Sequence, residues 1–244
     1  GYGSHKQMEH DAIFTQHIIT LESEDEVDDF LEGHHLFHGV RHRANGNDPG
    51  NILGEISIGS NACGNCHFRD GRSSEIFDTP RGPRIAPPVF GTGLLEWVAG
   101  REAGFRWDGQ VDTVRDQTIG ALAEDHGINA TDLNQISTRD LDRIITYVET
   151  LSVPARSYAA HDDVSVQLGN RLFMQTGCSS CHSITQKTRP DAPLIFRDLV
   201  LRPYTDMKLH DVTGQPIRTP ALWGIGRNIT LLEDNDRPLL FMHD

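Results

Sequence analysis

The chain has 244 residues and a formal net charge of −13, because 22 Lys and Arg face 35 Asp and Glu. Such an acidic chain argues against a nucleic acid as a partner, since phosphate binding needs a basic surface. Apolar residues make up 37% of the sequence, which supports a buried core. No apolar run approaches the roughly 20 residues that cross a bilayer, so we expect no transmembrane segment.

Residues 1–29 are polar and end in a cluster of Asp and Glu, where we expect an acidic N-terminal extension. Two copies of one pattern follow. In each copy a Gly-x-x-Leu-Phe segment, at residues 33–37 and 169–173, precedes a C-x-x-C-H string, at residues 63–67 and 178–182. This repetition predicts two related modules.

The segments between the two strings predict loops and one clear helix. Residues 39–61 and 79–88 are rich in residues that favour turns, above all Gly, Asn, Asp and Pro. The stretch that starts at Ser137 predicts a helix cap, and apolar residues then recur at helical spacing as far as Leu151. Pro154 ends this helix. Because sustained strand alternation is absent, we predict an all-α fold with long loops.

We expect the chain to divide into four parts. The first domain covers residues 30–151 and the second covers residues 164–244, with a linker at residues 152–163 and the acidic extension at residues 1–29. A short Gly-x-x-Leu-Phe helix that leads into C-x-x-C-H resembles the start of a cytochrome c domain. By that resemblance each domain would be cytochrome c-like.

The C-x-x-C-H strings predict covalent haem. Two thiols on one helical turn are placed to add across the two vinyl groups of a porphyrin, and the following His ligates the iron from the same side. A zinc site would need its two C-x-x-C pairs about 15–20 residues apart, and a redox dithiol gives no reason for a following His. We predict two c-type haems, attached at Cys63, Cys66 and His67 and at Cys178, Cys181 and His182.

Covalent attachment of haem also predicts a compartment. The reaction takes place outside the cytoplasmic membrane, so we expect a periplasmic or extracellular protein. Residues 1–7 lack the charged-then-apolar pattern of a secretory signal. We therefore expect the signal peptide to be absent from this chain because it has been removed.

The sixth ligand of each iron decides between electron transfer and reaction with a small molecule. Between the strings the histidine candidates are His126 and His161, and three further histidines precede the first string, namely His34, His35 and His38. After the second string the candidates are Met207, His210, Met242 and His243. We prefer His210 over Met207 and leave the first iron open at this point.

Several short motifs, in order, resemble the bacterial di-haem cytochrome c peroxidase and MauG superfamily, nearest its di-haem oxidoreductase branch. A Pro-rich segment at residues 86–88 leads to a Trp-Asp-Gly-Gln stretch at residues 107–110, and Gln117 follows ten residues after the tryptophan. Residues 204–211 resemble the oxidoreductase branch. Residues 218–222 and 241–244 resemble the Arg-x-Pro-x-Leu and Tyr-x-His-Asp-Gly elements of the superfamily.

The resemblance implies roles for three residues. Trp107 would lie between the haems and assist electron passage, and Gln117 would line the distal side of the first haem. Asp125 would stand in for the acid that helps to cleave the O–O bond. The family has a methionine after this acid, whereas this chain has His126, a candidate iron ligand that would close the site. The sequence departs from the branch at Val212, where the branch has a methionine, and it stops at Asp244, before a further helix of the peroxidases.

Two functions follow from these residues. The first is a peroxidase-type oxidoreductase in which electrons pass from the second haem to the first, with Trp107, Gln117 and Asp125 as the catalytic residues. The second is a non-enzymatic electron-transfer cytochrome with two bis-His haems, in an oligomer or wire. Its extra ligands would come from neighbouring copies through His5, His10 or His17. The expected partner is a small cytochrome, a cupredoxin or another copy of the chain.

Overall fold

The structure is a computed structural model, and it describes residues 21, 23–39, 62–79, 82–155, 163–211, 214–238 and 240. Several predictions lie outside these residues. They include most of the acidic extension, the loop at 40–61 and the middle of the linker. The histidine and methionine candidates outside them are His5, His10, His17, His161, Met242 and His243.

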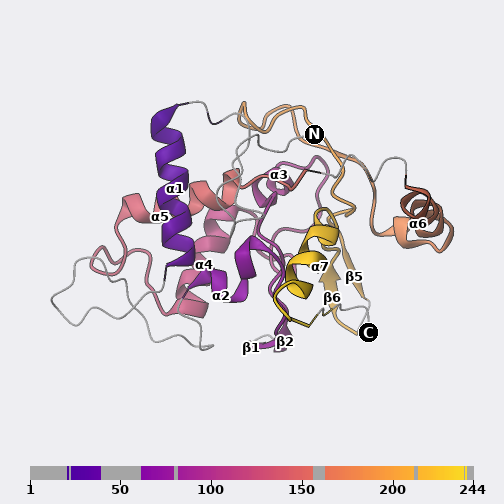
Figure 1. Cartoon of the computed structure of the whole chain (residues 1–244). Helices are drawn as coiled ribbons and strands as arrows, with labels where there is room; N and C mark the ends of the chain where they lie inside the picture. Colours follow the sequence, from indigo (N-terminus) through magenta and orange to yellow (C-terminus); the bar gives the residue numbers. More distant parts are fainter. Residues whose placement is uncertain are drawn as a thin grey trace.

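The first half of the chain is a group of helices (Figure 1). In chain order these are α1 (Glu24–His38), α2 (Cys63–Cys66), α3 (Thr92–Glu96), α4 (Val114–His126) and α5 (Thr138–Thr150). Ser23 and Glu26 form a capping box that starts α1, so the acidic cluster supplies the first turn of that helix. Ser137 accepts a hydrogen bond from the Asp140 amide at the start of α5, which confirms the predicted cap.

The helices α1 and α5 pack face to face and form the centre of the core. Gly33 permits their close approach, because a Cβ there would collide with the Arg143 carbonyl oxygen and with the Tyr147 side chain. The rings of Phe30 and Tyr147 lie 5.0 Å apart and are fully buried. At the rim, Arg143 Nε donates to Asp29 Oδ1 at 3.0 Å. The acidic end of α1 is therefore tied to α5.

Three small antiparallel sheets show that the prediction of an all-α fold is wrong. The strands are β1 (Phe77–Thr79) with β2 (Gly82–Arg84), β3 (Gln186–Lys187) with β4 (Val200–Leu201), and β5 (Leu209–Asp211) with β6 (Pro216–Arg218). Each strand has only two or three residues. Strands this short carry too few residues for alternation to be visible in the sequence, and pairing with a partner strand decides their conformation. The fold is mixed.

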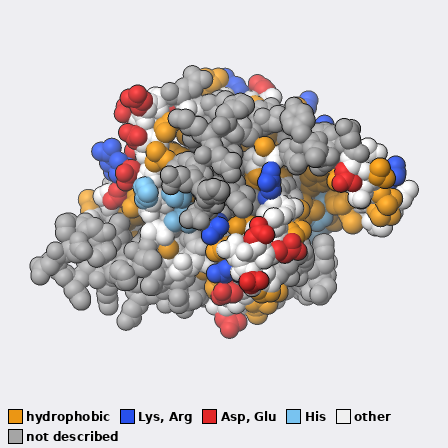
Figure 2. All heavy atoms as spheres, in the orientation of Figure 1, with side chains coloured by type: hydrophobic (Ala, Val, Ile, Leu, Met, Phe, Trp, Pro, Cys, Tyr) orange, Lys and Arg blue, Asp and Glu red, His pale blue; other side chains and the backbone are white. Residues whose placement is uncertain are grey.

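The second half of the chain contains α6 (Val164–Gln175) and α7 (Ile225–Glu233). Figure 1 shows α6 set apart from the other helices, and α6 has no buried residue. Its apolar side chains are exposed, for example Val164 at 73% and Leu172 at 48%, and Figure 2 shows hydrophobic atoms gathered there. Gly169 holds the place in this repeat that Gly33 holds in the first, yet it faces open space.

Backbone hydrogen bonds join the two halves. The Ala99 amide donates to the Lys187 carbonyl and the Arg189 amide to the Trp97 carbonyl, both at 2.8 Å. Further along, the Ala103 amide donates to the Met207 carbonyl at 2.9 Å. The two-domain division stays a prediction. Within the described part of the chain, every helix falls short of the length and hydrophobicity that a bilayer crossing requires.

Candidate functional site

A cavity of about 320 Å³ lies between the two halves and brings both predicted haem strings to one place. The whole first string contributes through Cys63, Cys66 and His67, and the second string contributes His182. The lining is mainly apolar and comes from α4, the Pro-rich segment and the stretch after β6. Polar side chains interrupt it at several points, among them Arg72, Arg106, Trp107, Gln117, Asp125, His126 and Arg218.

His67 is held by the Pro-rich segment. Its Nδ1 lies 2.7 Å from the carbonyl oxygen of Pro87. A histidine that donates Nδ1–H to a backbone carbonyl presents Nε2 as the free electron pair for a metal. Burial lowers the pKa of His67, so the imidazole stays neutral, which is the form that binds iron. The proline motif thus positions the first predicted iron ligand.

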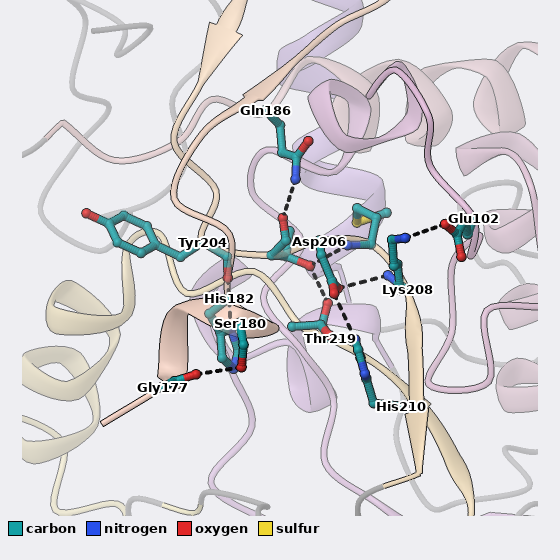
Figure 3. Close-up of polar contacts among 12 residues, drawn as sticks. Glu102, Gly177, Ser180, His182, Gln186, Tyr204, Asp206, Lys208, His210 and Thr219 are labelled. Atoms are coloured by element: carbon teal, nitrogen blue, oxygen red, sulfur yellow. Dashed lines mark hydrogen bonds and ion pairs between the residues drawn. The ribbon is translucent and has the colours of Figure 1, made fainter. Parts of the chain in front are cut away.

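His182 repeats this arrangement in the second string. Its Nδ1 lies 2.8 Å from the carbonyl oxygen of Tyr204, as Figure 3 shows, and its side chain is buried. The ring of Phe173 lies 6.3 Å from the His182 ring, and the ring of Tyr204 lies 5.7 Å from Phe173. The two strings therefore hold their histidines by the same kind of backbone hydrogen bond.

The four cysteines, all within the described residues, form no disulfide bond with one another. In the first string Cys63 and Cys66 are the two ends of α2, one helical turn apart. Gly64 between them has room for no side chain, because a Cβ would collide with the imidazole of His38. In the second string Cys178 is exposed and Cys181 is half-buried. Each string thus keeps the pair of thiols that its sequence pattern requires.

The helix α4 places the predicted distal residues on the wall of the cavity. Gln117, Asp125 and His126 all line it, and His126 is 5% exposed. The Nε2 of His126 lies 3.5 Å from Cys63 Sγ. Gln117 Oε1 accepts a hydrogen bond from Arg106 Nε at 3.0 Å, so its amide is oriented. Of these three residues, His126 has a contact with the first string, and the distal roles of Gln117 and Asp125 stay predictions.

Trp107 lines the same cavity as His67 and His182, and its position between the haems stays a prediction. Its Nε1 donates to the carbonyl oxygen of Ile85 at 3.1 Å, which fixes the plane of the indole. Ile85 belongs to the segment that leads to Pro87, the partner of His67. The tryptophan and the first histidine are thus positioned by one stretch of backbone.

His210 and Met207, the described candidates for the sixth ligand of the second iron, lie beside the second string. Each of them contacts another side chain instead. His210 Nε2 lies 2.8 Å from Asp206 Oδ2, and Figure 3 shows the His210 ring directed toward Asp206. The Asp206 amide in turn donates to the Cys181 carbonyl at 2.9 Å. Met207 is fully buried, with its sulfur 3.3 Å from Arg218 Nη1. The choice of His210 over Met207 stays a prediction.

The histidines of α1 lie behind the first string. The rings of His34 and His38 are 4.7 Å apart, and His38 Nε2 lies 2.9 Å from the fully buried Asp70. Burial and the neighbouring His38 lower the pKa of His34 to about 4. Neither histidine lines the cavity, so they pack the outer side of the string.

Sequence reasoning missed the cationic side chains of the cavity. Arg72 Nε donates to the Leu240 carbonyl at 2.8 Å, and burial lowers the pKa of Arg72. Arg218 is 9% exposed and belongs to a quoted motif, yet the motif gave no sign of its burial. The carbonyls of Pro87 and Tyr204 were missed too, because any residue supplies a backbone oxygen.

The residues present fit haem. Within the described residues no three His, Cys, Asp or Glu side chains come together as a ready-made metal site. Haem needs no such group, because the porphyrin holds the iron and the protein adds one or two axial ligands. An apolar cavity, two oriented imidazoles and cysteines that form no disulfide supply those needs.

Comparison with known proteins supports this site. Residues 116–235 match the family described as di-haem oxidoreductase, putative peroxidase. The match confirms the predicted resemblance, and the family implies haem as the cofactor. It covers α4 with Gln117 and His126, and the second string with His182. No curated protein matches the chain.

Proposed function

We propose that this di-haem oxidoreductase is a periplasmic or extracellular c-type cytochrome with peroxidase-type activity. In this proposal the thioether bonds form at Cys63 and Cys66 for the first haem and at Cys178 and Cys181 for the second. His67 and His182 are the proximal ligands. The proposal goes beyond the family description in the covalent attachment, the compartment and the direction of electron flow.

The observation that carries the proposal is the shared cavity. One cavity is lined by His67, His182 and Trp107. An indole between two proximal histidines gives a short route for electrons, and two haems held this way would exchange electrons without leaving the protein. A pair of unrelated haem sites would have no need of a common cavity.

The bound haems would supply iron that gains and loses single electrons. The chain's own residues do the rest. Trp107 carries the electron between the two sites. Gln117, oriented by Arg106, donates its amide hydrogens to the oxygen substrate, and Asp125 accepts and returns a proton as a general acid–base. Reduction of one hydrogen peroxide takes up two electrons and two protons and releases two waters.

The electrons enter at the second string in this proposal. Cys178 is exposed, and the apolar side chains of α6 around it are exposed as well. An open haem edge with an apolar surround suits docking of a small redox protein, such as a small cytochrome or a cupredoxin. The donor thus gives electrons to the second haem, and the cavity passes them to the first.

A second function is favoured by the position of His126. This buried imidazole lies at the first string, 3.5 Å from Cys63 Sγ. If it binds the iron, the first haem has no open position, and the protein transfers electrons without reacting with peroxide. His210 would play the corresponding part at the second haem, and neighbouring copies would be the partners.

Two measurements test the proposal. Mass spectrometry of the denatured holoprotein should give two haems per chain. The double variant Cys63→Ser/Cys66→Ser and the matched variant Cys178→Ser/Cys181→Ser should each keep one. Peroxide turnover should fall by roughly 10²–10⁴ in Asp125→Asn, the range for loss of a general acid–base.

Asp116→Asn on the exposed first turn of the same helix is the control and should keep its turnover. A holoprotein with two haems, no high-spin signal in either redox state and no peroxide turnover would contradict the peroxidase proposal and leave the electron-transfer function.

A further inference from the structure

Arg218 lies at the end of β6 and forms part of the wall of the haem cavity. Its amide donates to the Trp107 carbonyl at 2.7 Å. In the side chain, Nε donates to the Arg106 carbonyl at 3.3 Å and Nη1 to the sulfur of Met207 at 3.3 Å. The guanidinium is thus held in one place by the backbone of the tryptophan segment and by a buried methionine.

No carboxylate of the described residues forms an ion pair with Arg218. Other arginines near the cavity and the core have such partners, as Arg106 has Glu124 and Arg143 has Asp29. The acceptors of Arg218 are a carbonyl and a thioether, and a thioether sulfur is a weak acceptor. Burial, together with the neighbouring Arg101, lowers the pKa of Arg218 to about 10, so the side chain is still charged at neutral pH.

A buried charge in a folded protein is normally paired, because removal from water without a counter-charge is costly. An anion that enters the cavity would supply this counter-charge. Haem carries two propionate carboxylates, and the planar fork of a guanidinium matches a carboxylate with two parallel hydrogen bonds. Arg218 lines the cavity that haem would occupy under the proposed function.

We propose that Arg218 binds a propionate of the first haem and sets the position and reduction potential of that haem. The first haem is the partner because both cysteines and the histidine of its string line the cavity, whereas the second string contributes only His182. The inference rests on the proposed haem attachment at Cys63 and Cys66. It assigns Arg218 as a positioning residue that acts through the porphyrin.

The charge of Arg218 has a defined electrostatic effect. A reduced haem carries one more negative charge than an oxidised haem, so a fixed positive charge beside it favours the reduced form. Removal of that charge in Arg218→Gln should lower the reduction potential of the first haem. We expect at least a tenfold change in the ratio of oxidised to reduced haem at a given potential, which is about 59 mV for a one-electron couple.

The experiment is a spectroelectrochemical titration of holoprotein in which both haems are attached. Arg218→Gln is compared with Arg218→Lys, which keeps the charge and loses the fork, and with Arg202→Gln on an exposed arginine as the control. The first haem should shift down in Arg218→Gln, less in Arg218→Lys, and not in Arg202→Gln. The propionate bending band in the resonance Raman spectrum should shift in both Arg218 variants.

If Arg218→Gln does not fold, Arg218→Lys still provides a test, because its propionate band reports the contact between residue 218 and the haem propionate. An unchanged propionate band in Arg218→Lys, or a shift confined to the potential of the second haem, would overturn the inference. If the unsubstituted protein carried no haem at Cys63 and Cys66, the proposed function itself would be overturned. Failure of the Arg218 inference and failure of the proposed function therefore give different results.

Discussion

The Nε2 atom of His126 lies 3.5 Å from the sulfur of Cys63, which joins the end of α4 to the first haem string. The role of His126 separates the two proposed functions, because the first iron is open to peroxide only if His126 does not bind it. Under the peroxidase proposal the first haem binds external ligands in the presence of His126. We therefore expect cyanide to bind the oxidised holoprotein and His126→Ala to change its dissociation constant by less than about tenfold, or about 1.4 kcal/mol.

A much larger gain in cyanide affinity in His126→Ala, with conversion of a low-spin to a high-spin spectrum, would identify His126 as the sixth ligand. His35→Ala is a suitable control, since His35 lies on α1 and does not line the cavity.

Trp107 should control electron passage between the haems. Its indole lies in the shared cavity and is oriented by the hydrogen bond to the Ile85 carbonyl. Trp107→Leu removes the ring, and we expect inter-haem electron transfer to slow by at least about tenfold, because misplacement of reacting groups by about 1 Å already has effects of this size or larger. Flash photolysis followed at both haems measures this rate.

Trp97→Leu provides the matched control for Trp107. The Cζ atom of Arg189 lies 4.9 Å from the centroid of the Trp97 ring, and Trp97 does not line the cavity. Equal slowing in the two tryptophan variants would show that the effect is structural and would remove Trp107 from the electron route.

The two repeat glycines should respond in opposite ways to alanine. At Gly33 an added methyl group meets the Arg143 carbonyl and Tyr147, so Gly33→Ala should lower the free energy of unfolding by about 1–3 kcal/mol, as overpacked cores do. At Gly169 the methyl group meets open space, so Gly169→Ala should raise the stability of α6 by about 0.5–1 kcal/mol. Urea unfolding with far-UV circular dichroism measures both. A destabilised Gly169→Ala would show that α6 is packed in solution.

Glu149 should make stability depend on pH. Burial, with the nearby carboxylate of Glu96, raises the pKa of Glu149 from 4.5 to about 7 in the folded protein. The folded state then binds the proton more tightly than the unfolded state, so this contribution to stability is present below pH 4.5 and is lost as the pH rises through 7. We expect Glu149→Gln to be more stable than the unsubstituted protein at pH 8 by about 1–2 kcal/mol, and equally stable at pH 4.

Glu233→Gln on the exposed end of α7 is the control for Glu149, because Glu233 is a glutamate that is not buried. Thermal unfolding at pH 4 and pH 8 gives both comparisons. If the stability difference between Glu149→Gln and the unsubstituted protein were the same at pH 4 and pH 8, the raised pKa of Glu149 would be contradicted.

The predicted helix at residues 138–150 was confirmed and the predicted all-α fold was wrong, for a physical reason. The helix at residues 138–150 was predicted from its Ser137 cap and its apolar spacing, and α5 confirms both. The loop predicted at residues 79–88 contains β2 instead, whose partner β1 lies just before it. Caps and helical spacing are local and can be read from neighbouring residues. A two- or three-residue strand exists only through its partner.

The sequence by itself predicted haem attachment at the two C-x-x-C-H strings, because the thiols and imidazole of one string are adjacent in the chain. Its short motifs also predicted the resemblance to the di-haem oxidoreductases, which the match over residues 116–235 confirms. Only the tertiary structure decided that His67 and His182 share a cavity, that His126 reaches Cys63, and that Arg218 is buried away from any described carboxylate. These relations join residues far apart in the chain. They depend on how α4 and the hairpin β5–β6 pack around the cavity, and short motifs carry no record of that packing.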